Sequence, residues 1–408
     1  MTAPAPLPDG VPEPIVDEPS RPVSIELPQS LRPYTRTVVR WRPGCEVVVL
    51  RDGAETYPAM LEAMRAAKCS IVLETYILAS DETGDRFKDV LLERTKAGIA
   101  VRVIYDAVGS FGLSGAFVGE LRAGGIEVVD FNPIAPWRRK FRLSHRDHRK
   151  ILVVDDEIAF TGGLNIGNEY ASVEDGGSGW HDMHCRVTGP IVIDLARMFR
   201  GTWLRGGGKY YKPLPSAAHF SSHATGSSFV RLIDNTRRRQ RATVRRAFLH
   251  VIRTAREAVW IQNAYFLPDR GLRRSLTRAV GRGVDVQVMV PGRSDVRIIE
   301  WASLYAMRKL AKQGVKIRRW RGVMMHAKTA VIDSLWSTIG SYNFDAMSRF
   351  NNLEVTLEIL DPVVGTTLVA NFEQSLVNCD LYTNEDWKKL PWYTKALAWV
   401  CFRLRRFL

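Results

Sequence analysis

The chain has 408 residues, which is long for a single hydrophobic core, so two domains are the natural expectation. Hydrophobic residues make up 46% of it, which excludes a wholly disordered chain. The formal net charge of +15 favours a polyanionic partner, either nucleic acid or an anionic membrane, and charge alone does not choose between the two.

Cysteine usage and hydropathy bound the compartment. Five cysteines are scattered, odd in number and without a C-x-x-C pair, which favours a reducing compartment over a disulfide framework or a zinc site. The first residues have neither a basic start nor an apolar run, and no apolar stretch approaches the length of a membrane span. We therefore expect no signal peptide and no spanning helix, and a cytosolic location.

The first half of the sequence alternates strands with helices. Residues 1–35 are rich in proline and show little apolar periodicity, which predicts a flexible leader. Apolar runs and helical spacing then predict, in chain order, strands at 37–41 and 45–50, a helix at 57–68, a strand at 71–77, a helix at 84–96 and a strand at 100–105. Such an order is typical of a layered α/β domain with a largely parallel sheet.

The second half repeats this order. A predicted helix at 245–258 leads into a predicted strand at 259–266, the stretch 283–290 matches 98–105, and 314–318 matches 125–129. A repeat of this extent predicts two homologous lobes, residues 36–205 and 229–385, joined by a Gly-, Ser- and Pro-rich linker at 206–228.

Residues 386–408 differ from the rest in composition, because they are basic and rich in tryptophan. Helical spacing from Trp392 gathers Leu397, Val400, Cys401, Leu404 and Leu408 on one face. This pattern predicts an amphipathic helix that lies on an anionic membrane surface. The alternative is a helix docked onto the protein's own surface.

One motif occurs twice. The first copy has His148, Lys150 and Asp155, followed by Gly162, Gly163 and Asn165; the second has His326, Lys328 and Asp333, followed by Gly340, Ser341 and Asn343. In each copy an apolar run separates the H-x-K pair from the aspartate, which predicts a strand followed by a turn. Residues two apart on a strand share a face, so the histidine and lysine of each copy point the same way.

Two such pairs brought together would surround a phosphodiester with two imidazoles, two ammonium groups and the two asparagine amides. The economical division of labour makes one histidine the nucleophile and the other the acid–base partner. This chemistry needs no metal, and the sequence offers no carboxylate cage for one, so we expect no cofactor.

The duplicated motif resembles the signature of the phospholipase D superfamily. Within that superfamily the chain, from about Val38 onward, resembles bacterial cardiolipin synthases that lack amino-terminal membrane spans. The resemblance implies two lobes packed side by side about a pseudo-twofold axis with one shared active site. It also implies His148 as nucleophile and His326 as acid and base, through a covalent phosphohistidine.

The same resemblance implies further site residues. Acidic residues downstream of each motif, here Asp182 and Glu354, would orient the histidines, while Asp155 and Asp333 would anchor the motif turns or the facing histidine. Pocket-lining residues would be Glu74, Tyr76 and Asp106. His145, His181, His184 and the arginines of 237–241 are expected to be ordinary loop, strand or solvated residues.

Three functions fit the motif. The favoured one is transfer of a phosphatidyl group from phosphatidylglycerol to the hydroxyl of a second phospholipid. The alternatives are a phospholipase D that hydrolyses headgroups and, less favoured, a nuclease or a scaffold with a vestigial site. The expected partners are anionic phospholipids (phosphatidylglycerol and cardiolipin) and a membrane surface, without nucleic acid, at the cytoplasmic side of a bacterial cell membrane.

Overall fold

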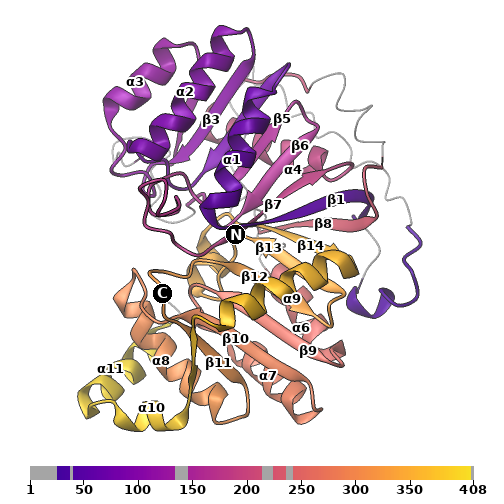
Figure 1. Cartoon of the computed structure of the whole chain (residues 1–408), viewed down its shortest axis with the longest axis vertical. Coiled ribbons are helices and arrows are strands. Elements are labelled where there is room, and N and C mark those ends of the chain that lie inside the picture. Colours follow the sequence, from indigo (N-terminus) through magenta and orange to yellow (C-terminus); the bar gives the residue numbers. More distant parts are fainter. Residues whose placement is uncertain (1–24, 37–39, 134–145, 214–223, 236–241, 406–408) are drawn as a thin grey trace, which may run out of the picture.

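The structure is a computed structural model of the chain, and it describes residues 25–36, 40–133, 146–213, 224–235 and 242–405. Within these residues a 15-stranded sheet runs through the molecule in the order β15-β11-β10-β9-β12-β13-β14-β8-β1-β7-β6-β5-β2-β3-β4. Figure 1 shows the strands of the first half above, those of the second half below, and helices packed along both.

The first half of the sheet and its helices come from the expected first lobe. Its elements are β1 (Arg42–Arg51), α1 (Asp52–Arg65), β2 (Ser70–Thr75), α2 (Glu82–Lys96), β3 (Ala100–Asp106), α3 (Gly115–Ala123), β4 (Glu127–Phe131), β5 (Ile151–Val154), β6 (Ile158–Gly162), β7 (Met183–Thr188) and α4 (Val192–Gly206).

The second half repeats this succession and then adds an edge strand and two helices. Its elements are β8 (Ser228–Asp234), α6 (Thr243–Thr254), β9 (Ala258–Asn263), α7 (Arg270–Gly281), β10 (Asp285–Pro291), α8 (Arg297–Ala311), β11 (Lys316–Trp320), β12 (Lys328–Ile332), β13 (Trp336–Gly340), β14 (Val355–Leu360), α9 (Pro362–Leu376), β15 (Cys379–Tyr382), α10 (Asn384–Lys389) and α11 (Trp392–Leu404).

The two halves have the same strand order when the sheet is followed outward from its centre. There β1 and β8 form an antiparallel pair, with Arg42 opposite Val230 and Cys45 opposite Ser228. Outward from β1 lie β7, β6, β5, β2, β3 and β4, and outward from β8 lie their counterparts β14, β13, β12, β9, β10 and β11. The expected pair of homologous lobes is confirmed, and the two lobes share one sheet.

The sheet is mixed, as expected, but its parallel part is smaller than the sequence suggested. Within the described residues parallel pairing between strands is confined to β2-β3-β4 and β9-β10-β11. The strands that carry the motifs, β5 to β7 and β12 to β14, pair antiparallel. Short turns connect β5 to β6 and β12 to β13, and longer segments without a crossover α-helix connect β6 to β7 and β13 to β14.

Local sequence explains why the repeated helices begin and end where they do. The carboxylates of Asp81 and Asp269 each accept a hydrogen bond of 2.9 Å from a backbone N–H in the first turn of α2 and α7. Gly98 and Gly283 follow these helices with φ of +87°, a conformation that glycine adopts without strain. Capped and terminated in the same way, both helices lead directly into the central parallel strands.

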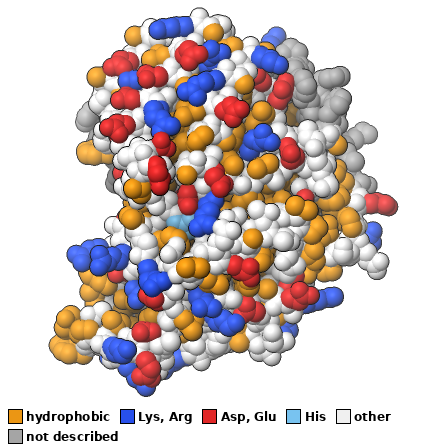
Figure 2. Space-filling model, in the orientation of Figure 1, with side chains coloured by type: hydrophobic (Ala, Val, Ile, Leu, Met, Phe, Trp, Pro, Cys, Tyr) orange, Lys and Arg blue, Asp and Glu red, His pale blue; other side chains and the backbone are white. Residues whose placement is uncertain are grey.

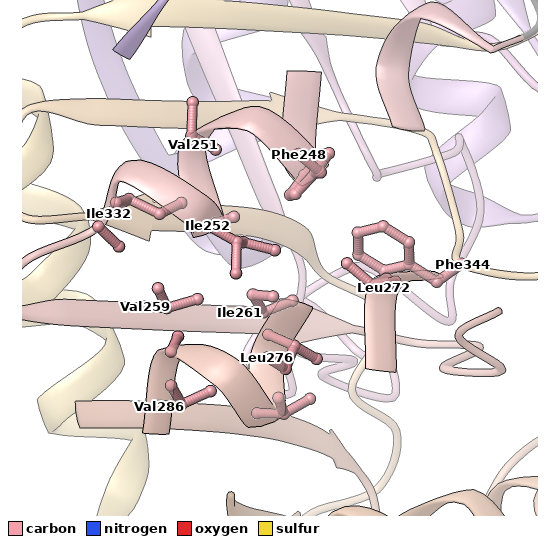
Figure 3. Close-up of a cluster of buried hydrophobic side chains, with 14 of the residues drawn as sticks. Phe248, Val251, Ile252, Val259, Ile261, Leu272, Leu276, Val286, Ile332 and Phe344 are labelled. Carbon is pink, nitrogen blue, oxygen red and sulfur yellow. The ribbon is translucent and has the colours of Figure 1, made fainter. Parts of the chain in front are cut away.

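Three large buried clusters hold the lobes together. One combines α1, α2 and α3 with the first half of the sheet, and a second does the same with α6, α7 and α8. Figure 3 shows the second: Phe248 and Ile252 of α6 and Leu276 of α7 point onto Val259 and Ile261 of β9. The third cluster joins α4 and α9 across both lobes, so the hydrophobic core is continuous through the junction.

Part of the segment predicted to be a flexible leader is packed against the second lobe. Leu27, Leu31 and Tyr34 are buried in the core of the second lobe, and the Tyr34 hydroxyl donates to Asp333 at 2.7 Å. Three apolar side chains at a spacing of four and three are enough to dock this segment, although its proline content suggested disorder. Residues 1–24, and the middle of the predicted linker (214–223), lie outside the described residues.

The helix predicted near the end of the chain is present, but one side of it packs against the second lobe. α11 packs along α8 through Ala398, Cys401 and Phe402, which are buried. Cys401, which the sequence placed on the face predicted to meet lipid, therefore faces the protein. Leu397, Val400 and Leu404 are exposed.

Candidate active site

The two H-x-K pairs lie at corresponding places beside the junction of the lobes. His148 and Lys150 immediately precede β5, while His326 lies two residues before Lys328, the first residue of β12. All four side chains are buried. The sequence predicted that these pairs share one site, and the structure brings them together there.

Each histidine is held by the opposite lobe. Nδ1 of His148 lies 3.1 Å from Oε2 of Glu354, and Nδ1 of His326 lies 2.7 Å from Oδ2 of Asp182. The backbone contacts cross in the same way, because the N–H of each histidine donates to the carbonyl of the residue just before the facing carboxylate, at 3.0 Å for His148 and 2.7 Å for His326. Neither half-site is complete without the other lobe.

The glycine and serine of the two motifs fit these two carboxylates. A Cβ on Gly163 would lie 2.1 Å from Oδ1 of Asp182, so only glycine leaves room for that carboxylate. At the same place in the second motif the Ser341 hydroxyl donates to Oε2 of Glu354, and the Ser348 hydroxyl donates to Oε1 at 2.7 Å. The first motif thus has glycine beside the aspartate Asp182, and the second has serine, which donates a hydrogen bond, beside the glutamate Glu354.

Two residues that the sequence analysis missed hold the carboxylate-bearing segments. Oδ1 of Asp52 accepts from the N–H of Asp182 at 2.9 Å and lies 2.7 Å from Nδ1 of His181. Oδ1 of Asn235 accepts from the N–H of Glu354 at 2.7 Å. Asp52 follows β1 and Asn235 follows β8, so they are counterparts in the repeat. A comparison of the residues that follow these two strands in the sequence could have identified them.

The two ammonium groups fold back onto the histidine backbone. Nζ of Lys150 donates to the carbonyl of His148 at 2.7 Å, and Nζ of Lys328 donates to the carbonyl of His326. Burial and the charge of Lys328 lower the pKa of Lys150 to about 7. Burial also lowers the pKa of Lys328, to about 8. A buried anion between them would relieve both effects.

The histidines are arranged to present a free nitrogen. Burial and the neighbouring lysine lower the pKa of His148, and the same two causes lower the pKa of His326 to about 4. Burial acts to raise the pKa of Asp182, but Lys328 and His326 outweigh it and hold the pKa at about 2. An ionised carboxylate only accepts, so we assign the proton of each imidazole to Nδ1 and the lone pair to Nε2; at His326 the same Nδ1 also lies 2.6 Å from Nζ of Lys328.

Asp155 and Asp333 do not reach the pocket. They follow the far ends of β5 and β12, with φ of +56° and +52°. The Asp155 carboxylate accepts backbone N–H groups of residues 68–70 at 2.7, 2.7 and 2.8 Å, and Asp333 accepts those of 256–258 at 2.9, 2.8 and 2.8 Å. Of the two roles expected of them, these contacts fit the anchoring of the motif turn and not a contact with the facing histidine, because each aspartate ties its motif strand to the start of the neighbouring strand.

The motif asparagines occupy less equivalent positions than expected. Asn165 accepts from the N–H of Ile77 at 3.1 Å and donates to the Tyr170 hydroxyl at 2.6 Å, and that hydroxyl lies 3.5 Å from Nδ1 of His326. The buried Oδ1 of Asn343 has no hydrogen-bond partner within the described part of the chain. Asn165 therefore contacts His326 of the opposite lobe through the Tyr170 hydroxyl. Asn343 has no such role, and its Oδ1 is available to accept a hydrogen bond.

Of the three pocket candidates, only Tyr76 reaches a histidine. Its ring centroid lies 4.9 Å from that of His148 and 5.2 Å from Nζ of Lys150. Glu74 is buried against an arginine 3.7 Å away, and Asp106 accepts three backbone N–H groups at 2.9, 3.1 and 2.9 Å. Glu74 and Asp106 therefore support the fold around the site.

The remaining histidines are structural where they are described. The ring of His181 stacks on Trp320 at 4.7 Å, and His184 is buried, which lowers its pKa to about 3. His145 and the arginines of 237–241 lie outside the described residues. Within the described ranges no group of three or more His, Cys, Asp and Glu side chains forms a candidate metal site.

Comparison with known proteins agrees with this geometry. A family model described as cardiolipin synthase, PLD-like domain, matches residues 60–176 and 248–376, one segment in each lobe. The chain is 32% identical over 353 residues to a cardiolipin synthase of Halalkalibacterium halodurans, covering 86% of this chain and 70% of that protein. It is 33% identical over 317 residues to cardiolipin synthase A of Pseudomonas syringae, covering 78% and 65%.

Solved structures show the same fold. The crystal structure of phosphatidylserine synthase from Haemophilus influenzae superposes with a TM-score of 0.67, covering 89% of this chain and 95% of that one at 14% identity. The duplicated lobes and paired H-x-K motifs define a phospholipase D-like enzyme that transfers phosphatidyl groups. The chain belongs to the cardiolipin synthase family of PLD-like proteins.

Proposed function

We propose that the enzyme moves a phosphatidyl group from phosphatidylglycerol to a hydroxyl of a second phospholipid, through a phosphohistidine on His148. The observation that carries this proposal is the crossed pair of carboxylate–histidine contacts, Glu354 to His148 and Asp182 to His326. It leaves two imidazole Nε2 atoms available in one pocket with two buried ammonium groups, which suits two successive displacements at one phosphorus.

In the first displacement Nε2 of His148 attacks phosphorus and the bond from phosphorus to the glycerol oxygen breaks. His326 gives its Nε2 proton to the departing oxygen, so glycerol leaves neutral. The negative charge of the bound phosphodiester offsets Lys328 and so raises the pKa of His326, which lets it carry that proton.

In the second displacement the acceptor hydroxyl gives its proton to His326 and its oxygen attacks phosphorus. The phosphorus–nitrogen bond breaks and its electron pair returns to His148. Lys150 and Lys328 stabilise the charge on the non-bridging oxygens in both steps.

We further propose that the protein docks on the cytoplasmic face of an anionic membrane through the outer face of α11. Figure 2 shows apolar side chains gathered over α11 at the lower left of the molecule. Trp392, Tyr393 and Trp399 are 79%, 61% and 47% exposed, and Lys395 and Arg403 lie on the same helix. Exposed aromatic and basic residues on one helix favour the interface of an anionic bilayer. No helix of the described residues has the length and apolarity of a membrane span.

The transfer reaction is tested by lipid analysis of cells that lack their own cardiolipin synthases. We expect cardiolipin with the parent chain and none with His148→Ala or His326→Ala. Phosphatidic acid without cardiolipin would instead identify a hydrolytic phospholipase D, and loss of nucleic acid without a new lipid would identify a nuclease.

The membrane contact is tested by flotation with phosphatidylglycerol vesicles. Truncation after Asp386 should release the protein from the vesicles, but it also uncovers α8, so the double substitution Trp392→Glu and Trp399→Glu is the cleaner variant. Val377→Glu is the control, because Val377 is 75% exposed and follows α9, outside α11. Continued flotation of the double variant would place the membrane contact elsewhere.

A further inference from the structure

The two half-sites differ at the residues that follow the central parallel strands. Tyr76 is the first residue after β2 and Tyr265 is the second residue after β9, and the ring of each lies edge-on to the histidine of its own lobe, at 4.9 Å for His148 and 6.3 Å for His326. The Tyr265 hydroxyl donates to Asp295, whose two oxygens lie 2.7 and 2.9 Å away. The Tyr76 hydroxyl has no hydrogen bond to a described residue.

The carboxylates near these tyrosines differ as well. Asp106, at the end of β3, is fully buried and its oxygens are occupied by backbone N–H groups. Asp295, which follows β10, is exposed, and its contacts are the hydroxyl of Tyr265 and the hydroxyl of Ser294 at 3.3 Å. A carboxylate has room for about four hydrogen bonds, so Asp295 can accept more from a ligand.

We propose that Asp295 and Tyr265 form a binding site for the acceptor alcohol, and that they recognise a second hydroxyl next to the one that reacts. This inference rests on the proposed function, in which His326 removes the proton from the acceptor. Tyr265 is edge-on to that histidine, so the pair lies on the acceptor side of the pocket.

The charge of this pair also suits a diol. A carboxylate repels a second phosphate group but accepts strongly from hydroxyls, since hydrogen bonds to charged groups are the stronger ones. Burial lowers the pKa of Lys328, and Asp295 is among the carboxylates near enough to offset part of that lowering, which places it close to the phosphate-binding end of the pocket. The glycerol headgroup of phosphatidylglycerol presents two adjacent hydroxyls, one to react and one to be held.

This site would favour transfer over hydrolysis. Water has no second hydroxyl, so it gains nothing from Asp295, whereas a 1,2-diol is held with one oxygen near Nε2 of His326. Oriented binding of this kind acts on the reaction rate through proximity. Loss of the carboxylate should therefore reduce transfer to diols while hydrolysis of the phosphatidyl-enzyme continues.

The test uses two soluble acceptors that differ by one hydroxyl, 1,2-propanediol and 1-propanol, with phosphatidylglycerol vesicles as donor. The full-length parent should prefer the diol by at least about tenfold, the value expected for a hydrogen bond to a charged group. Asp295→Ala and Tyr265→Phe should reduce that preference and lower the ratio of transfer to hydrolysis. Asp380→Asn, at an exposed aspartate of the edge strand, should keep both ratios at the parent value.

An Asp295→Ala variant that keeps the diol preference would overturn the inference while leaving the proposed function intact. An equal fall of transfer and hydrolysis would also overturn it, because that result would indicate a general role in the pocket. A parent chain that releases no product from phosphatidylglycerol would contradict the proposed function itself. Thermal unfolding of each variant separates these outcomes from loss of the fold.

Discussion

Oε2 of Glu354, in the second lobe, lies 3.1 Å from Nδ1 of His148, in the first. The mirror contact, from Asp182 in the first lobe to His326 in the second, measures 2.7 Å. Each lobe therefore supplies a histidine to one half-site and the carboxylate that fixes the proton position of the other. Duplication of the lobe is explained by this exchange, because one lobe alone would have a histidine without its carboxylate.

Neutralising either carboxylate should inactivate the enzyme without unfolding it. Glu354→Gln and Asp182→Asn keep the size of the side chain but remove the acceptor that holds the Nδ1 proton, so Nε2 loses its defined role. We expect transfer to fall by about 10²- to 10⁴-fold, the usual contribution of a positioned acid–base group. The measurement is cardiolipin formation per minute on vesicles; near-parental rates for either variant would contradict the crossed arrangement.

Gly163 should tolerate no side chain. Its Cβ would lie 2.1 Å from Oδ1 of Asp182, so Gly163→Ala must displace the carboxylate that orients His326. We expect a large loss of transfer with a small change in the unfolding temperature.

Gly119→Ala is the matched control for this substitution. Gly119 lies in α3 with open space where an added Cβ would stand, and alanine in place of glycine stabilises a helix by about 0.5–1 kcal/mol. Equal activity of the two alanine variants would show that room at Gly163 is not limiting.

Anion binding should be accompanied by proton uptake. The pKa values of Lys150 and Lys328 are lowered to about 7 and about 8 from 10.5, so above pH 7 the free enzyme lacks protons that an unfolded chain would carry. In the window from about 7 to 10.5 these lysines therefore make stability rise with pH. A bound phosphodiester favours the ammonium form and reverses the shift.

Calorimetry of glycerophosphoglycerol binding at pH 8, in buffers of different ionisation enthalpy, measures this uptake. We expect a net gain of protons by the enzyme and weaker binding as the pH rises above 8. Lys328→Met should bind more weakly and take up fewer protons. Binding without proton exchange would show that both lysines are already charged.

The residues that hold the carboxylate segments should matter nearly as much as the carboxylates. Asn235→Ala removes the acceptor for the N–H of Glu354, and Asp52→Ala does the same for Asp182. We expect about tenfold or greater loss of turnover with little change in KM, and a shifted pH profile of kcat, since histidine orientation changes while the lysines remain. A profile unchanged in shape would indicate a purely structural role.

Much of the fold could be predicted because the repeat is visible in the sequence. Gly98 and Gly283, and the strands that follow them, recur at corresponding places, and the motif fixes which strands carry His148 and His326. The crossing of Asp182 and Glu354 could not be predicted, because spacing along one lobe does not reveal which side chain of the other lobe it meets.

Other features depended on long-range packing for the same reason. Tyr34 lies in a proline-rich segment whose composition suggested disorder, and only the buried surface of the second lobe explains why it docks. Asp155 and Asp333 belong to the motif in sequence, yet the backbone N–H groups that they bind come from 68–70 and 256–258, which no local pattern connects to them.

The most direct test is to locate the covalent intermediate. His326→Asn should still release nitrophenol from phosphatidyl-p-nitrophenol, because that leaving group needs no proton, but it should not activate the acceptor. The predicted result is a burst of one nitrophenol per chain and, by mass spectrometry at alkaline pH, a phosphatidyl adduct on His148. Steady nitrophenol release without a burst, or an adduct on any other residue, would contradict the assignment of His148 as the nucleophile of a site shared by both lobes.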